Sequence, residues 1–207
     1  LEKLFVKKID NVIMEASSHG LKQNRLDGLK FNTGIFTNLS QDHLDYHLNL
    51  KNYLKAKLYL FEKLIKKGGN IITDDEIKQF KNIKKISLKN NLRLQTLNGN
   101  NNFKILSHTF NEDKQILKIK HKNTVRIINL NLIGRIQIKN ILMAILAAQK
   151  SNIELKKILS ILPKIKSVEG RLEKIGSIKN KSKVILDYAH TPEALKTCLL
   201  NLREQFP

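Results

Sequence analysis

Residues 14–20 and 36–47 read Met14-Glu15-Ala16-Ser17-Ser18-His19-Gly20 and Phe36-Thr37-Asn38-Leu39-Ser40-Gln41-Asp42-His43-Leu44-Asp45-Tyr46-His47. Each polar group ends or follows a short apolar run, over residues 11–15 and 34–38, and such runs are typical of buried strands in a parallel sheet. Open α/β sheets place their chemistry at the carboxyl ends of the strands. These polar residues are therefore the candidate site.

The residues that follow predict the rest of this unit. An amphipathic helix is expected over residues 50–67, ended by Gly68-Gly69, with a further strand over residues 70–73. Strand, loop, strand, helix and strand in this order indicate an α/β fold, with a mostly parallel sheet flanked by helices.

The second half of the chain has a different pattern. Three short alternating segments predict a small antiparallel appendage, over residues 103–110, 115–120 and 124–130. Two helices are expected over residues 137–150 and 153–162, then a linker over 163–170 and a strand over 184–187. A last helix should begin at Thr191-Pro192-Glu193, where a capping residue, a first-turn proline and an early acid follow one another.

Composition narrows the class of protein. The chain has 207 residues, 41% of them hydrophobic, and no apolar run approaches the roughly 18 residues of a membrane span. Its single cysteine, Cys198, fits a reducing cytoplasm and a role in core packing. The net charge of +20 raises the possibility of a nucleic-acid-binding module, but 32 lysines against 6 arginines are scattered over every segment. Aromatic residues are only 6%, too few for an obvious base-stacking surface, so we expect no nucleic-acid partner.

Several residues allow more than one interpretation. His43 and His47 are spaced to share a helix face as metal ligands, or they belong to a polar helix start whose acids cap backbone amides. Glu15 could bind Mg²⁺ at a strand end or could lie in solvent. Lys57, within an apolar stripe, either extends its amine to solvent or is desolvated and chemically special. A serine nucleophile among Ser17, Ser18 and His19 is disfavoured, because no Gly-x-Ser-x-Gly turn surrounds these residues.

The motifs together resemble the Mur ligase family, and most closely its branch that adds the third amino acid to the peptidoglycan precursor UDP-N-acetylmuramoyl-L-alanyl-D-glutamate. The resemblance covers about residues 10–200. Besides the two stretches quoted above, it rests on Gln23 and Arg25, Lys55-Ala56-Lys57, Gly170-Arg171-Leu172-Glu173 and Asp187-Tyr188-Ala189-His190-Thr191-Pro192. It implies a central ATP-binding domain over residues 1–167 and the beginning of a Rossmann-like C-terminal domain over 168–207.

The resemblance also implies a role for each matching residue. Glu15, His43 and a carbamylated Lys57 would be catalytic and would hold Mg²⁺. A desolvated, neutral lysine amine can capture CO₂, and a metal can stabilise the resulting anion. Ser17, Gln23 and Arg25 would bind the UDP-N-acetylmuramoyl-dipeptide.

ATP would be bound by four further residues: Gln137, Asn140, Arg171 and Asp187. The family's Phe-Asn-x-x-Asn is Ile136-Gln137-Ile138-Lys139-Asn140 here, so the first adenine contact is longer by one methylene. The implied enzyme is a monomeric cytoplasmic ligase that uses ATP and Mg²⁺ to join a free amino acid, diaminopimelate or lysine, to the dipeptide through an acyl-phosphate.

Two family motifs have no counterpart in this sequence, the Gly-x-x-x-x-Gly-Lys-Ser/Thr phosphate loop and Asp-Asn-Pro-Arg. We therefore expect the chain to be an internal piece of a longer ligase and to be inactive alone. The alternatives are another Mg-ATP amide ligase of the same fold, such as a folylpolyglutamate synthase, and the basic nucleic-acid-binding module. Ser17-Ser18-His19 argues against the first alternative.

Overall fold

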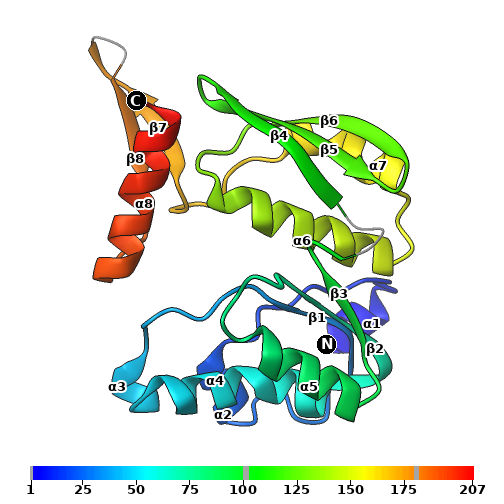
Figure 1. The fold of residues 1–207 in the computed structure, drawn as a ribbon. Helices are drawn as coiled ribbons and strands as arrows, with labels where there is room; N and C mark the ends of the chain where they lie inside the picture. The colour runs from blue at the N-terminus through cyan, green and yellow to red at the C-terminus, as the bar shows by residue number, and fades with distance from the viewer. Residues whose placement is uncertain (1, 100–102, 180–181) are drawn as a thin grey trace.

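The computed structural model describes residues 2–99, 103–179 and 182–207 (Figure 1). Its first half contains α1 (Glu2–Val6), α2 (Ser18–Lys22), β1 (Phe31–Phe36), α3 (Leu44–His47), α4 (Leu50–Tyr59), the π-helical turn η1 (Leu60–Leu64), β2 (Ile65–Thr73), α5 (Phe80–Lys89) and β3 (Arg93–Thr96). Its second half contains β4 (Phe103–Asn111), β5 (Lys114–His121), β6 (Thr124–Leu130), α6 (Ile136–Lys150), α7 (Leu155–Ile161), the 3₁₀ turn η2 (Leu162–Lys164), β7 (Glu173–Ser177), β8 (Lys183–Leu186) and α8 (Pro192–Gln205).

A parallel sheet of order β1-β2-β3 organises the first half, as predicted. Successive residues of β2 face opposite sides of this sheet. Ile71 packs with Leu58 and Phe61 of the α4 side, whereas Ile72 packs with the apolar residues of α6. Helices α4 and α5 therefore cover one face of the sheet and α6 covers the other (Figure 1).

The predicted helix over residues 50–67 is too long. Helix α4 ends at Tyr59, a π-helical turn follows, and β2 begins at Ile65 without an intervening loop. Gly68 and Gly69 are consequently not a helix cap but part of β2. Gly68 has φ +72°, and it lies where β2 bulges against β1 between the Phe31–Ile65 and Thr33–Asn70 pairs.

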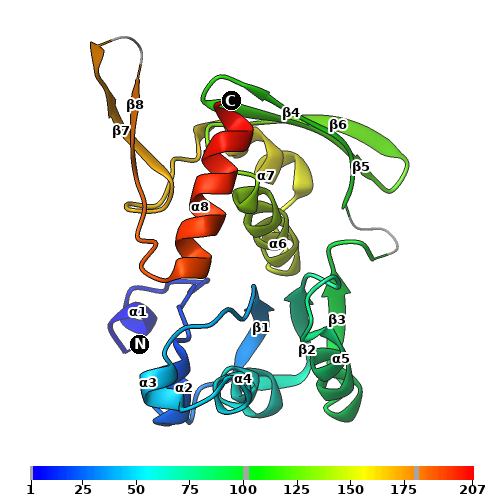
Figure 2. The same ribbon diagram turned by 60° about the vertical axis from the view of Figure 1, so that its left-hand side comes forward.

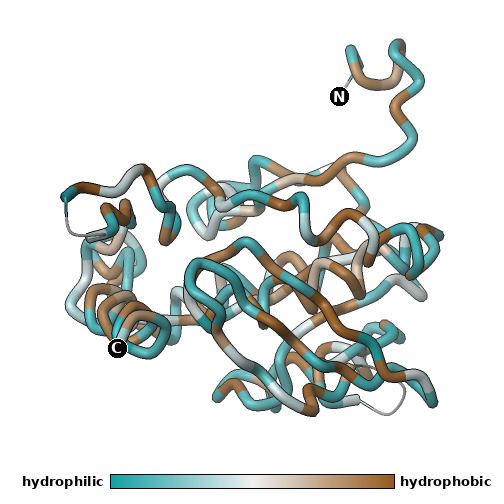
Figure 3. The backbone as a smooth tube through the Cα atoms, turned by 90° about the horizontal axis from the view of Figure 1, so that it is seen from above, coloured by the Kyte–Doolittle hydropathy of each residue, from teal (hydrophilic) through white to brown (hydrophobic). Residues whose placement is uncertain are grey.

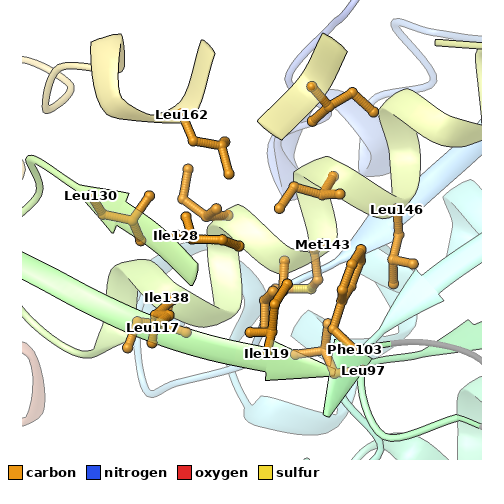
Figure 4. Close-up of a cluster of buried hydrophobic side chains, with 14 of the residues drawn as sticks. Leu97, Phe103, Leu117, Ile119, Ile128, Leu130, Ile138, Met143, Leu146 and Leu162 are labelled. Carbon is orange, nitrogen blue, oxygen red and sulfur yellow. The ribbon is translucent and has the colours of Figure 1, made fainter. Parts of the chain in front are cut away.

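The antiparallel appendage is confirmed. Strands β4, β5 and β6 form a meander, and one face of it packs on α6 and α7 (Figure 4). Leu117, Ile119 and Leu130 in this core are fully buried, and Figure 4 shows their side chains among those of the cluster. Helix α6 thus lies between the two sheets and contributes apolar side chains to both.

Strands β7 and β8 and helix α8 form a small unit, which we call the C-terminal unit. Strands β7 and β8 make a two-stranded antiparallel sheet, and α8 follows with Thr191 as its N-cap, accepting a hydrogen bond from the amide of Ala194 at 3.2 Å. In Figure 2, α8 runs between the α6 region and the segment that holds α1 and α3. The strand over 184–187 and the helix start at Thr191 are therefore confirmed to within one residue.

Some sequence-based expectations are wrong. Residues 11–15 form no strand: they are irregular and exposed, and Ile13 is 101% accessible. A buried parallel strand needs neighbours on both sides and cover on both faces, which none of the described elements gives this segment; Figure 3 shows the N-terminal residues extending away from the body. Helix α5 and strand β3 were not predicted, because their apolar residues are few and are separated by lysine, asparagine and arginine. No helix in the described part of the chain is long and apolar enough to cross a membrane.

Candidate functional site

Helices α2, α3 and α4 gather five rings, which we call the histidine cluster: His19, His43, Tyr46, His47 and Tyr53. His47 is fully buried, its Nε2 lies 2.9 Å from Ser18 Oγ, and its ring stacks on Tyr53 at 4.9 Å between centroids. Burial, followed by the nearby His19 and Lys22, lowers the pKa of His47, so its imidazole is neutral at pH 7. Because its Nε2 is hydrogen-bonded to Ser18, His47 connects α3 to α2. It therefore does not share an open metal site with His43.

Lys57 reaches the same place from α4. Its Nζ donates a hydrogen bond to the carbonyl of Asn38 at 3.1 Å and lies 5.1 Å from the centre of the Tyr53 ring and 5.7 Å from that of Phe36. Burial lowers the pKa of Lys57, while the carboxylate of Asp42 acts in the opposite direction. Of the two interpretations of this lysine, the structure favours the desolvated one, which has a larger neutral fraction than a lysine in water.

Asp42 links His43 to the C-terminal unit. One carboxylate oxygen lies 3.6 Å from Nε2 of His43, and the other lies 3.6 Å from Nε2 of His190. Beside it, the amide of Gln41 donates to Glu193 in the first turn of α8 at 3.4 Å. His43 precedes α3 in the left-handed conformation, with φ +52°, which turns the chain at this point. The loop after β1 therefore meets the start of α8.

The three residues expected to bind the nucleotide-sugar peptide lie around α2. The Oγ of Ser17 caps α2 by accepting from the amide of Gly20 at 3.1 Å, and Nε2 of Gln23 donates to the Tyr46 hydroxyl at 3.1 Å. Arg25 is exposed, and among the described residues its guanidinium has no ion pair. An unpaired arginine beside a polar helix start can receive a carboxylate or phosphate in a bidentate manner.

The two residues expected to contact adenine share the first turns of α6. Nδ2 of Asn140 donates to Oε1 of Gln137 at 3.4 Å. Between them in sequence, Lys139 pairs with Asp74 at 2.5 Å and Glu76 at 2.9 Å, at the carboxyl end of β2. Burial opposes ionisation of Lys139, but the two acids raise its pKa. The start of α6 is thus tied to the parallel sheet.

Arg171 and Asp187 line one pocket of about 430 Å³, together with Glu169, Gly170, Leu186 and Tyr188. Asp187 is held in place because its two oxygens accept from the amides of Leu172 and Ala189, both at 2.9 Å. The guanidinium of Arg171 lies 5.4 Å from the centre of the Tyr188 ring. Among the described residues, no hydrogen bond or ion pair joins this pocket to Gln137 or Asn140.

The three residues expected to hold Mg²⁺ do not all lie together in the structure. Asp42 and His43 are adjacent, and Lys57 faces the same ring as His43, but Glu15 lies on the exposed segment before α2. Within residues 2–99, 103–179 and 182–207, no group of three histidine, cysteine or acidic side chains could hold a metal ion. The arrangement is therefore not a preformed Mg²⁺ site.

Residues 1–148 match the family model described as the Mur ligase middle domain. The chain belongs to the Mur ligase family.

Relatives and solved structures agree with this membership. The chain is 37% identical over 201 residues to the UDP-N-acetylmuramoyl-L-alanyl-D-glutamate--2,6-diaminopimelate ligase of Rickettsia bellii, covering 97% of this chain and 42% of that protein. It is also 37% identical over 202 residues to the ligase of the same name from Fusobacterium nucleatum, covering 98% of this chain and 41% of that protein. The chain thus spans about two fifths of the length of these relatives.

Solved structures also resemble this Mur ligase chain. A structure of a UDP-N-acetylmuramoyl-L-alanyl-D-glutamate--2,6-diaminopimelate ligase superimposes with a TM-score of 0.75 at 27% identity, over 92% of this chain and 39% of that one. The structure of MurF from Acinetobacter baumannii gives a TM-score of 0.73 at 16% identity, over 84% of this chain and 38% of that one, which shows the shared fold alone.

Sequence reasoning missed several groups in this Mur ligase chain. Asp42 was considered only as a metal neighbour or a helix-capping acid, yet it faces two histidines from distant segments. Lys139 was passed over, although it fixes the helix of the expected adenine contacts. The available signal was its position between Gln137 and Asn140, combined with Asp74-Asp75-Glu76 directly after a predicted strand.

Proposed function

We propose that the protein carrying this chain is an ATP-dependent ligase that adds the third amino acid to UDP-N-acetylmuramoyl-L-alanyl-D-glutamate. The relatives that cover nearly the whole chain bear that activity and 2,6-diaminopimelate in their names, which supports diaminopimelate over L-lysine as the added residue. We include in the proposal that the enzyme is a cytoplasmic monomer, requires Mg²⁺ and binds no nucleic acid. Its central domain would comprise residues 1–167 and its C-terminal domain would begin at 168.

The observation that carries this proposal is the environment of Lys57. Its amine is partly desolvated, donates a hydrogen bond to the Asn38 carbonyl, and lies beside the ring that also contacts His43. A neutral amine there can form a carbamate: its nitrogen bonds to the carbon of CO₂, and one proton leaves to solvent. The lysine would then present an anion on the histidine-cluster side of the loop, where Mg²⁺ is a suitable counter-ion.

The proposed reaction requires this chain to bind the nucleotide-sugar peptide, to orient adenine and to contact the rest of the nucleotide. The reaction converts a carboxylate to an acyl-phosphate at the expense of ATP, and an amine then displaces phosphate to give an amide. Arg25, Ser17 and Gln23 would hold the anionic nucleotide-sugar peptide, with Arg25 supplying the charge. Gln137 and Asn140 would orient adenine, while Arg171 and Asp187 would reach the nucleotide from the C-terminal unit. Orienting both substrates is itself a large contribution to rate.

The test is a substrate-matched assay of the protein that carries this chain. It should release phosphate and form the tripeptide product, identified by mass, only when ATP, Mg²⁺, the UDP-N-acetylmuramoyl-dipeptide and diaminopimelate are all present. Replacing diaminopimelate by L-lysine measures the choice of amino acid. Turnover with a folate and glutamate in place of these substrates would overturn the proposal in favour of a folylpolyglutamate synthase.

A further inference from the structure

Helix α6 begins without a side-chain cap of its own. Arg135 occupies the N-cap position and makes no capping hydrogen bond. Instead, helix α8 supplies the acceptors. Oδ1 of Asn201 accepts from the amide of Ile136 at 3.0 Å, and Oε1 of Gln205 accepts from the amide of Gly134 at 2.9 Å. The Ile136 amide is the first of the helix and needs such an acceptor, so Asn201 caps α6 from a distant part of the chain, while Gln205 holds the residue that precedes the N-cap.

The residues around the contact between α8 and the start of α6 are buried and hydrogen-bonded. Gln205 is only 4% exposed, and its Nε2 donates to the carbonyl of Glu112 at 3.1 Å, so both ends of its amide are used. Gly134 has φ +87°, and a Cβ there would lie 2.5 Å from the Leu172 side chain. On the other side, Gln115 donates to the carbonyl of Gly134 at 3.0 Å. Asn201 and Gln205 are four residues apart and share one face of α8.

Further contacts fix α8 and its hairpin. Glu204 pairs with Arg135 at 2.8 Å, and Lys174 and Lys183 of the β7–β8 hairpin both pair with Asp113 in the β4–β5 turn, at 2.5 and 2.6 Å. At its other end, α8 meets the loop at Gln41. Figure 2 shows α8 spanning the distance between these two regions. One helix therefore contacts both the loop beside Lys57 and the start of α6.

We propose that α8 is a positioning element for the nucleotide site, in which Asn201 and Gln205 hold the first turns of α6 and thereby the side chains of Gln137 and Asn140. This inference rests on the proposed function, because it takes those two residues as the adenine contacts. Neither Asn201 nor Gln205 touches the nucleotide; both act through the backbone of α6.

The experiment compares three variants of the protein that carries this chain. Asn201→Leu removes the acceptor at similar volume. Asn201→Asp keeps an acceptor and adds a negative charge at the start of α6, where the helix dipole favours it. Arg203→Ala is the matched control, since Arg203 is exposed on α8 and, among the described residues, has no hydrogen bond or ion pair. The readouts are amide hydrogen exchange at Ile136 and the dissociation constants of a non-hydrolysable ATP analogue and of the UDP-N-acetylmuramoyl-dipeptide.

In Asn201→Leu, exchange at Ile136 should accelerate and the ATP analogue should bind about two- to tenfold more weakly, the factor that one neutral hydrogen bond contributes. Binding of the dipeptide should be unchanged. Asn201→Asp and Arg203→Ala should both bind the analogue as the wild type does. Unchanged exchange at Ile136, or faster exchange with unchanged analogue affinity, would overturn the inference. If the wild-type protein binds no ATP analogue, the proposed function fails as well, so the two failures are distinguishable.

Discussion

The core between the antiparallel sheet and α6 differs from the histidine cluster in almost every physical respect. In the core, residues such as Leu117, Leu142 and Ile145 are at most 2% exposed and pack as a continuous apolar layer. In the cluster, buried rings carry nitrogen and oxygen atoms, and Nδ1 of His47 is buried with no hydrogen-bond partner in the described part of the chain. The comparison teaches that the apolar layer that stabilises the fold and the polar rings beside which we propose the reaction lie in different segments of this chain.

The largest expected effect is that of Lys57→Ala on catalysis. If Lys57 bears the carbamate, turnover should fall about a thousandfold or more, equivalent to at least about 4 kcal/mol of transition-state stabilisation. The melting temperature should change little, because the amine donates a hydrogen bond to the Asn38 carbonyl and otherwise packs beside two rings. Steady-state kinetics and thermal unfolding measure the two quantities. Lys55→Ala, an exposed neighbour on α4, is the control. Near-normal turnover in Lys57→Ala would remove Lys57 from the mechanism.

Leu142→Ala should have the opposite pattern. Leu142 is 2% exposed in the core, so its truncation should lower the free energy of unfolding by about 2–5 kcal/mol through lost burial and a residual cavity. The Michaelis constants should stay at wild-type values. Urea unfolding gives the first quantity, with Ile161→Ala, at a site 50% exposed, as the control. A raised Michaelis constant at a temperature where the variant is folded would show that the two regions are not separable.

Arg25→Ala should affect one substrate only. Losing a charge-assisted hydrogen bond costs about 1.5–3 kcal/mol, so the Michaelis constant for the UDP-N-acetylmuramoyl-dipeptide should rise roughly ten- to a hundredfold. The constant for ATP should not change. Lys51→Ala, another exposed basic residue, controls for general loss of positive charge. An equal rise for both substrates would instead assign Arg25 a structural role.

The smallest effect concerns the pH dependence of stability. The pKa of His47 is lowered from 6.5, first by burial, so the unfolded chain takes up this proton at a higher pH than the native protein does. The free energy of unfolding should therefore fall as the pH decreases from about 6.5 towards the lower native pKa. His47→Gln should reduce that slope in urea unfolding at several pH values. Burial also lowers the pKa values of His108 and His121, so some slope should remain. If the free energy of unfolding of His47→Gln fell with pH as steeply as that of the wild type, His47 would not be a source of this pH dependence.

The sequence predicted the core between the antiparallel sheet and α6 better than the first half of the chain. The alternating strands over residues 103–130 and the helix over 137–150 follow from local apolar periodicity, which these segments obey because each has one buried face. The segment over 11–15 has the composition of a buried strand, but composition cannot supply neighbouring strands. Helix and strand in residues 50–73 were divided incorrectly, since the π-helical turn at Leu60–Leu64 continues the helical pattern up to the first residue of β2.

For the candidate site, the sequence predicted residue types and neighbourhoods but not contacts across the fold. Ser17, Gln23 and Arg25 do lie around α2, and Gln137 and Asn140 do lie together at the start of α6, because each set is local in sequence. The meeting of Asp42 with His190 joins residues far apart in the chain. Spacing within one segment contains no information about such a pair.

The π-helical turn connects α4, the helix that carries Lys57, directly to β2 without a flexible loop. Five residues, Leu60–Leu64, are all that separates the last turn of α4 from the first residue of a strand anchored in the sheet. A π-helical turn holds about one residue more than an α-helical turn, so deleting one residue here would restore α-helical winding with little net rotation of α4 relative to β2. An α-helix advances about 100° per residue, so inserting one residue between Lys57 and Leu60 would instead turn Lys57 away from the Asn38 carbonyl. The number of residues between Lys57 and β2 therefore sets the direction of the lysine, and this connection should tolerate substitution far better than insertion.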